Sequence, residues 1–507
     1  MTHLAILPIL LPAIVAALLA LAGRRDLVLA RTISLASAAV LLLVAIALVV
    51  GASDGMIRTY ALGDWPAPFG IVLVVDRLAA LMLTLTAGLA LAVLLHCANG
   101  WDARGRHFHA LFQFQLMGLN GAFLTGDFFN LFVFFEILLI ASYGLMVHGG
   151  GAERVRAGLQ YVVVNLVGST LFLFAVGLLY GVTGTLNMAD LALKVPAVPP
   201  ADHGVLRSGA LLLLFVFALK AALVPLHLWL PGTYANAPAP VAALFAVLTK
   251  VGAYAIVRLS TLAFGDAAGE LAWLVTPWLM PAAMLTLTLG MFGVLAARRL
   301  AGMISFAVVG SVGTLLIAVA LFTPQAIAAA LYYLVQSTLA AGALFLVVDL
   351  VGERRPALGD LLAPGPRIAQ AALLGSLFLV AAIAMTGLPP LAGFVGKLLI
   401  LDATRDAFNR SWIWSLLLTT SLLAIVGFAR AGSVLFWKGG ESAQNAAVQP
   451  ARAAVLPLIA IGLLLAANIA WTLGAGQVLG YLDAAAIQLF APAGYIDAVL
   501  GAEGGNE

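Results

Sequence analysis

The stretch LKAALVPLHLWLP, residues 219–231, decides the fold of this chain. It places Lys220 inside a run that otherwise has the composition of a membrane-buried helix, and Pro225 follows five residues later. The apolar run that comes next carries a second lysine, Lys250. A lysine at the centre of a membrane helix costs roughly 2.5–3.5 kcal/mol on insertion scales, and a proline frees a backbone carbonyl that needs another partner. Such costs indicate that these residues are kept for function.

The composition is that of a membrane protein. Of the 507 residues, 63% are hydrophobic and 9% are charged, whereas roughly 25% are charged in an average soluble domain. Apolar runs of about 20 residues follow one another from Leu4 to Leu473, a pattern that soluble chains do not show. The net charge of +3 argues against nucleic acid as a partner, and the single cysteine, Cys97, excludes a disulfide framework within the chain.

The apolar runs predict an all-α polytopic membrane protein with about 14 transmembrane helices. The first is expected to be retained rather than cleaved as a signal peptide. We expect the alanine-rich tail after Leu473 to be partly ordered at best. The predicted segments are 3–22, 30–51, 71–98, 109–127, 128–148, 157–183, 208–230, 240–263, 271–296, 302–322, 325–350, 368–401, 411–436 and 452–475.

The basic residues predict the orientation. Loops after odd-numbered segments hold more than half of the 25 lysines and arginines. Because cytoplasmic loops carry the excess of basic residues, an even number of segments places both termini on the non-cytoplasmic side of the cell membrane. We interpret Asp76 and Arg77 as an interfacial ion pair, and leave Arg430 open between structural pairing and the end of a charge relay. The basic residues within segments are Arg77, Lys220, Lys250, Lys397 and Arg430.

Two predicted segments are interrupted in the same manner. Segment 7 contains Pro225, and segment 12 contains GLPPLAG at residues 387–393, with Lys397 one to two turns later. Helices broken by Gly and Pro in corresponding places of two halves point to inverted repeats and to a transport site. Because segment 12 comes five segments after segment 7, we predict two inverted five-helix repeats, segments 4–8 and 9–13. The units are then 1–108, 109–263, 264–436 and 437–507.

Glu136 and three lysines are the candidate transport residues. Glu136 lies near mid-membrane in segment 5, where a carboxylate must be paired or protonated. Lys220 and Lys250 also lie near the middle of their segments, and burial favours the neutral form of an ammonium group. A Glu136–Lys220 pair whose separation changes can therefore load and unload a proton. Lys397 should reach backbone carbonyls that the break of segment 12 exposes.

Polar residues near these positions leave alternatives open. His227 either relays protons or caps the broken helix by bonding a freed carbonyl. Gln336 and Tyr333 can hold water along a path. The sequence has no Walker phosphate loop, no dinucleotide-binding turn in the right context and no cysteine cluster. We therefore expect no cofactor, no metal site and a secondary transporter rather than an enzyme.

Three motifs carry a family resemblance: PLHLWLP at 225–231, YANAPAPV at 234–241 and LTKVGAYA at 248–255. They resemble the antiporter-like proton-pumping subunits shared by respiratory NADH–quinone oxidoreductase and the multisubunit Mrp-type cation/proton antiporters. The chain is most similar to the family of D subunits of the Mrp type. The resemblance covers segments 3 to 13 and implies 14 spans, inverted five-helix repeats and broken helices 7 and 12. It implies a proton path through Glu136, Lys220, Lys250 and Lys397.

The resemblance implies a proton-translocating subunit of a multisubunit Na⁺/H⁺ antiporter, assembled with other membrane subunits. A path lined by lysines repels Na⁺, so we expect Na⁺ to cross elsewhere in the assembly. The alternatives are a proton-pumping subunit of an NADH–quinone oxidoreductase-type redox complex and a scaffold without transport. Relatives often have a histidine and a lysine in segment 11, where this chain has Gln336-Ser337-Thr338. Water held by these side chains would have to bridge the two halves.

Overall fold

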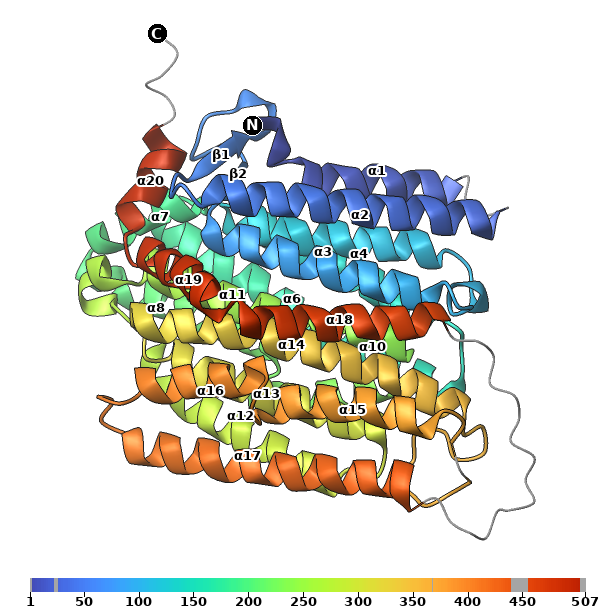
Figure 1. Ribbon diagram of the computed structural model, residues 1–507. Helices are drawn as coiled ribbons and strands as arrows, with labels where there is room; N and C mark the ends of the chain where they lie inside the picture. Colours follow the sequence, from blue (N-terminus) through green and yellow to red (C-terminus); the bar gives the residue numbers. More distant parts are fainter. Residues whose placement is uncertain (1, 22–25, 367, 439–454, 502–507) are drawn as a thin grey trace.

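The computed structural model describes residues 2–21, 26–366, 368–438 and 455–501. Long helices lie side by side, and their ends gather at two opposite ends of the molecule (Figure 1). Within the described ranges, 11 helical stretches are long and apolar enough to cross a membrane, and Leu7–Leu21 and Ala371–Thr386 are shorter apolar helices. The chain is therefore a predominantly α-helical, polytopic membrane protein, as its sequence predicted.

Each predicted segment contains at least one helix. The number of membrane crossings, the inverted repeats and the boundaries of the four units stay predictions. Residue 22 of segment 1, residues 452–454 of segment 14 and most of the stretch 437–454 lie outside the described residues. The helices that are continuous through their segments are α1 (Leu7–Leu21), α2 (Leu27–Ala52), α3 (Arg77–Cys97), α4 (Phe108–Leu124), α5 (Phe128–Met146), α6 (Ala152–Thr183), α12 (Thr276–Ala296), α13 (Leu300–Val319), α14 (Pro324–Glu353), α17 (Arg410–Gly432) and α18 (Val455–Leu473).

Segments 7 and 12 are broken where the sequence predicted. The first consists of α8 (His203–Ala221), a 3₁₀ turn (Leu226–Leu228) and α9 (Trp229–Asn236). The second consists of α15 (Ala371–Thr386) and α16 (Ala392–Ala403). Both leading helices end in a left-handed residue, Ala222 with φ 58° and Gly387 with φ 80°. Prolines follow within three residues in both cases, and a proline cannot continue a helix without losing a hydrogen bond.

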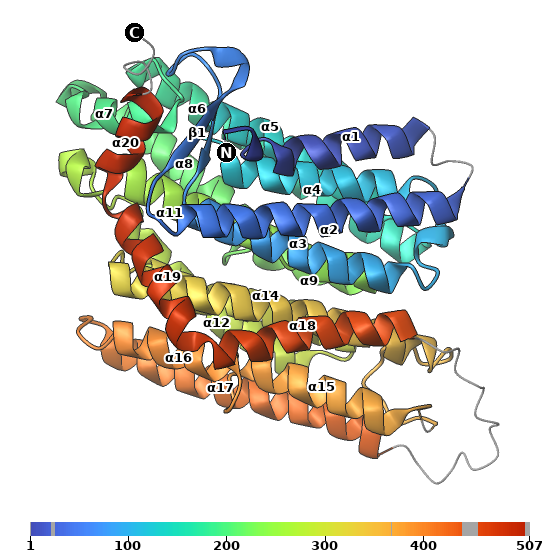
Figure 2. The ribbon, with the colours of Figure 1, turned by 45° about the horizontal axis from the view of Figure 1, so that its top comes forward.

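Segment 8 also has an interruption, which the sequence analysis did not predict. Its helix is divided into α10 (Ala239–Phe245) and α11 (Leu248–Arg258), and a π-helical turn (Leu259–Ala263) follows. Every residue from Pro240 to Ala263 is buried. The same holds for α14 from Ala326 to Val351. These two stretches form the centre of the bundle, and the other helices surround them (Figure 2).

Three expectations about the loops and termini were wrong. Segment 3 begins as a strand, since β2 (Val72–Val75) pairs antiparallel with β1 (Arg58–Ala61). The tail after Leu473 is helical up to Leu500, as α19 (Ala475–Leu489) and α20 (Pro492–Leu500), because α19 packs on α14 and α20 packs on α7 (Met188–Lys194). In Figure 2, α18, α19 and α20 run on from one another across the bundle. The tail beyond residue 501 lies outside the described residues.

The third wrong expectation concerns Asp76 and Arg77. Asp76 pairs with Arg258 at the end of α11 instead, and Arg258 Nη1 lies 2.6 Å from Asp76 Oδ2. Asp76 also caps α3, accepting a hydrogen bond from the Ala79 amide at 2.8 Å. Arg77 donates to the backbone oxygens of Ser53 and Ala484. The adjacent pair is thus split between two networks.

Loops after odd-numbered segments meet at one end of the bundle. Arg154 donates to the backbone oxygen of Asn236 at 3.1 Å. Arg299 donates to Asn236 Oδ1 at 3.1 Å and to Asp360 Oδ1 at 2.9 Å. The β-hairpin, α19 and α20 lie at the opposite end, here called the hairpin end (Figure 1). We call the end where the loops after odd-numbered segments meet the arginine-rich end. Its loops are 98–107, 147–151, 237–238, 297–299 and 354–366.

Candidate functional site

Glu136 is half-buried on α5, where Ser169 of α6 donates a hydrogen bond to its Oε1. Asp127 caps the start of this helix by accepting from the Asn130 amide at 2.7 Å. That cap fixes where α5 begins, and therefore which face Glu136 presents to α6. The carboxylate is thus held by a neutral hydroxyl rather than by a lysine.

Lys220 is buried near the end of α8, just before the break. Its Nζ donates to Asn165 Oδ1 of α6 at 3.0 Å and lies 5.9 Å from the ring centre of Phe135. Within the described residues, it forms no ion pair with Glu136 inside 4.0 Å. Asn165 and Ser169 are one helical turn apart on α6. The predicted Glu136–Lys220 pair is therefore linked through two neutral side chains.

A small cavity adjoins Lys220. Its volume is about 20 Å³, and Lys220, Asn165 and Tyr161 contribute its polar lining. The rest of the lining is apolar or aromatic, and a space of this size has room for one water molecule beside these three polar groups. The side chain of Tyr161 is hydrogen-bonded to Ser142 at 2.9 Å. Lys220 therefore borders a space in which a water molecule can take or supply a proton.

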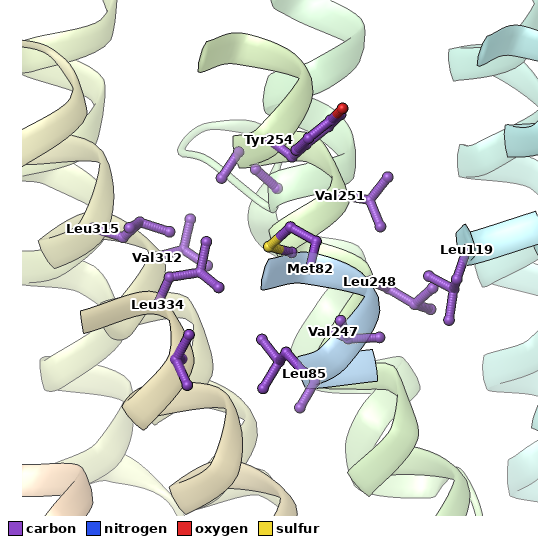
Figure 3. Close-up of a cluster of buried hydrophobic side chains, with 14 of the residues drawn as sticks. Met82, Leu85, Leu119, Val247, Leu248, Val251, Tyr254, Val312, Leu315 and Leu334 are labelled. Carbon is purple, nitrogen blue, oxygen red and sulfur yellow. The ribbon is translucent and has the colours of Figure 1, made fainter. Parts of the chain in front are cut away.

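Lys250 lies fully buried on α11, in largely apolar surroundings. Its Nζ donates to Thr249 Oγ1 at 3.3 Å, and the neighbouring side chains of Val247, Leu248 and Val251 belong to a cluster to which α3, α4, α13 and α14 contribute (Figure 3). A methyl group added at Gly252 would lie 2.6 Å from the backbone oxygen of Phe217. Gly252 thus permits α11 to approach α8, which carries Lys220.

Lys397 is buried on α16 and bonds the carbonyl that the break leaves free. Its Nζ donates to the backbone oxygen of Thr386, the last residue of α15, at 2.7 Å. It also donates to Ser421 Oγ of α17 at 2.7 Å. A freed carbonyl and a hydroxyl replace the carboxylate that a buried ammonium group usually takes as its partner.

A tryptophan caps the helix before the break of segment 7, and His227 forms a hydrogen bond with the backbone of Pro225 within the break. Trp229 Nε1 donates to the backbone oxygen of Leu219 at 3.0 Å, and the Val224 amide donates to Thr286 Oγ1 at 2.9 Å. His227 is buried, and its Nδ1 has no hydrogen-bond partner in the described part of the chain. Its side chain is therefore open to a water molecule or a proton, and its role stays a prediction.

Comparisons with known proteins show the family of the chain. The family model described as "NADH:quinone oxidoreductase/Mrp antiporter, TM" matches residues 125–425. The chain belongs to this family. It is 40% identical to the D subunit of a Na⁺/H⁺ antiporter of Bacillus subtilis, over 99% of this chain and 100% of that protein. It is 43% identical to the probable D subunit of a K⁺/H⁺ antiporter of Rhizobium meliloti, over 99% and 98%.

A solved structure is similar over the same length. It is described as the "Structure of Mrp complex from Dietzia sp. DQ12-45-1b", and a chain of it superposes with a TM-score of 0.86 at 29% identity, covering 99% of this chain and 100% of that chain. The likeness therefore extends beyond segments 3 to 13, to nearly the whole chain. The resemblance predicted from the three motifs is confirmed.

Segment 11 of this Mrp antiporter family member carries Gln336 in the middle of α14. Its side-chain oxygen and nitrogen are both buried and without a hydrogen-bond partner in the described residues. Its backbone oxygen accepts from Asn468 Nδ2 of α18 at 3.1 Å. Buried amides are normally satisfied, so a water molecule bound to Gln336 would complete its hydrogen bonds, and this role stays a prediction.

Sequence reasoning missed the neutral partners of the charged residues. Asn165, Ser169 and Ser421 hold them, and the only signal was the four-residue spacing of the first two on an apolar helix. Arg430 donates to the backbone oxygens of Leu295 and Ala297 at the end of α12, which favours its structural interpretation. In the part of the chain that the structure describes, no group of three or more His, Cys, Asp or Glu residues could hold a metal ion.

Proposed function

We propose that the chain is the D subunit of a multisubunit monovalent cation/proton antiporter and that it carries protons along Glu136, Lys220, Lys250 and Lys397. The observation that carries the proposal is the set of three buried lysines, each with a neutral oxygen as its hydrogen-bond partner. An ammonium group without a carboxylate partner is easily neutralised in a low-dielectric interior. Each lysine can therefore release and rebind a proton.

Protons reach the path through the helices of segments 4–8, and Lys250 passes them toward Lys397. Water held by Gln336 supplies the link across α14, and His227 is a further relay candidate beside the first break. Na⁺ or K⁺ crosses elsewhere in the assembly, because a path lined by lysines repels a metal cation. Na⁺ and K⁺ are both candidate substrates, because one relative is named as a Na⁺/H⁺ antiporter subunit and another as a K⁺/H⁺ antiporter subunit.

The chain works in the cell membrane with other membrane subunits, and its arginine-rich end faces the cytoplasm. The concentration of basic loops at that end supports this orientation, which leaves both termini on the outer side. The alternative, a proton-pumping subunit of a redox complex, is less well supported. Relatives that match over the full length are named as antiporter subunits.

Cation/proton exchange in everted membrane vesicles that contain the complete antiporter tests the proposal. We expect Lys220→Ala to lower exchange at least about tenfold with either cation, because the relay loses its first lysine. The matched control is Lys194→Ala, which removes an exposed lysine paired with Asp190 at 2.9 Å. Exchange at the parent rate in the Lys220 variant, with the complex assembled, would refute the role of that residue.

A further inference from the structure

A pocket at the arginine-rich end leads toward the middle of the bundle. Its volume is about 370 Å³. Trp101 and Arg104 line it from the loop after α3, Ala239 from the start of α10, and Asp349 and Glu353 from the last turns of α14. The pocket thus lies between helices of both predicted repeats, and a carboxylate forms part of its inner wall.

A buried histidine pairs with that carboxylate. His96 Nε2, on α3, lies 2.7 Å from Asp349 Oδ2, and the side chains are 1% and 7% exposed. Trp101 Nε1 donates to the same oxygen at 2.7 Å. Asp349 therefore joins the pocket on one side to a fully enclosed imidazole on the other.

The second nitrogen of His96 is available for a proton. Its Nδ1 is buried and has no hydrogen-bond partner in the described residues. Since Nε2 is engaged by Asp349, a proton that arrives can be taken up at Nδ1, and the carboxylate stabilises the imidazolium that forms. Burying two ionisable groups is often no more stabilising than apolar packing. The stability of the contact between α3 and α14 therefore does not by itself explain the pair.

The charges around the pair come from three elements. On α14, Glu353 and Arg354 lie one turn beyond Asp349 and interact with it. From the loop after α3, Arg104 lies 3.7 Å from Glu353 and its guanidinium lies 3.7 Å from the ring centre of Trp101. Asp102 of the same loop and Asp349 both interact with the buried thiol of Cys97 on α3. The wall of the pocket also carries Arg154, Arg299 and Asp360. The pocket thus carries both acidic and basic groups. The carboxylates can take up protons, and the guanidinium groups oppose the binding of a metal cation.

A short stretch of chain connects the pocket with Lys250. Ala239 lines the pocket, and Lys250 follows eleven residues later through α10 and α11. At about 1.5 Å per residue this stretch spans roughly 16 Å. The helix that carries His96, α3, packs against α10. The helix that carries His96 is therefore in contact with the helix that precedes the second buried lysine.

We propose that His96 and Asp349 form a proton-binding site that exchanges protons between the water of this pocket and Lys250. Hydronium in the pocket gives a proton to the pair through Asp349, which lines the pocket, and becomes water. The pair then holds the added proton as an imidazolium protonated at Nδ1 beside the Asp349 carboxylate. The proton then leaves Nδ1 toward the interior and the neutral pair is restored. The inference rests on the proposed function, and it adds a loading site that none of the four charged relay residues provides.

His96→Gln in the complete antiporter tests the site, because the glutamine amide can still donate to Asp349 but cannot carry a proton. We expect normal assembly, exchange in vesicles at least about tenfold lower, and a weaker dependence of the exchange rate on pH than in the parent. The matched control is His109→Gln. His109 Nε2 also lies beside a buried carboxylate, Asp102, at 3.2 Å, and its Nδ1 is likewise unpartnered in the described residues, but Asp102 lines a different pocket, whereas Asp349 lines this one.

Three outcomes separate the claims. If His96→Gln exchanges as the parent does while Lys220→Ala does not exchange, the site is refuted and the proposed function stands. If neither variant lowers exchange, the proposed function is refuted, and the site that rests on it is refuted as well. If His109→Gln loses exchange to the same extent as His96→Gln, the effect is structural and the site is refuted.

A second variant tests the site in case His96→Gln does not assemble. Trp101→Phe removes one donor to Asp349 and leaves the His96 pair in place. The carboxylate then holds a proton on the pair more tightly, so the pH profile of exchange should move toward higher pH by about one unit. An unchanged profile in an assembled Trp101 variant would overturn the proposal.

Discussion

Replacing Arg258 by methionine should destabilise the protein strongly. Arg258 Nη1 lies 2.6 Å from Asp76 Oδ2, and the two side chains are 5% and 2% exposed. The substitution keeps most of the aliphatic volume but leaves a buried carboxylate unpaired, which costs roughly 3–5 kcal/mol. The pair joins the start of α3 to the end of α11, and Arg258 lies 5.4 Å from the ring centre of Tyr495 on α20. The start of α3, the end of α11 and helix α20 therefore lose a contact that they share.

Thermal unfolding of the purified protein in detergent measures the effect. We expect the midpoint to fall by on the order of 5 °C. The control is Arg405→Met, because Arg405 pairs with Asp402 on the surface, with side chains 67% and 44% exposed. An exposed pair contributes only about 0–1 kcal/mol, so this midpoint should hardly move.

A double-mutant cycle separates the ion pair from general packing. Asp76→Asn keeps a side-chain oxygen that can cap α3 and removes the charge. The double variant Asp76→Asn, Arg258→Met should lose less stability than the two single variants together, by on the order of 2 kcal/mol. The reasoning is refuted if the two losses are additive, or if the buried and the exposed arginine prove equally dispensable.

Two further predictions concern a loop and the relay. Burial raises the pKa of Asp102, but hydrogen bonds from His109 and Arg31 outweigh it and lower the pKa below the ordinary value of 3.8. Asp102→Asn should therefore cost roughly 2 kcal/mol at pH 7. Unfolding curves should show this loss shrinking below about pH 4, as the carboxylate is protonated first in the unfolded chain and at lower pH in the folded protein; a pH-independent difference contradicts it. Asn165→Leu removes the oxygen that holds Lys220, so vesicle exchange should fall about tenfold, and an unchanged rate contradicts the relay geometry.

The helices and the breaks of segments 7 and 12 could be predicted from the sequence because each rests on local chemistry, whereas the interruption of segment 8 could not. An apolar run of about 20 residues has few alternatives to a membrane helix. A glycine or proline next to such a run marks where the hydrogen-bond ladder ends. The same reasoning found Lys220, Lys250 and Lys397, because an ammonium group in an apolar run is visible without any knowledge of its partner.

The rest depended on contacts that a single run of sequence does not contain. Val72–Val75 are continuous with the apolar residues of α3, so only their pairing with β1 reveals a strand. Helix α19 is rich in alanine and looked like a loose tail, but its apolar face is covered by α14. Asp76 lies next to Arg77 in the sequence, yet its partner is Arg258, 182 positions away. Neighbours in sequence are a poor guide to neighbours across a helix bundle.

The position of α6 gives the Glu136–Lys220 link a mechanical property. Asn165 and Ser169 sit on this one helix and hold the two charged groups of α5 and α8. The opposite side of α6 is apolar and exposed, including Val167 and Phe174. A sliding movement of 1–2 Å, of the size seen when helices shift at subunit interfaces, would break both hydrogen bonds together. A neighbouring subunit that displaces α6 from the lipid side would thus uncouple the carboxylate from the lysine.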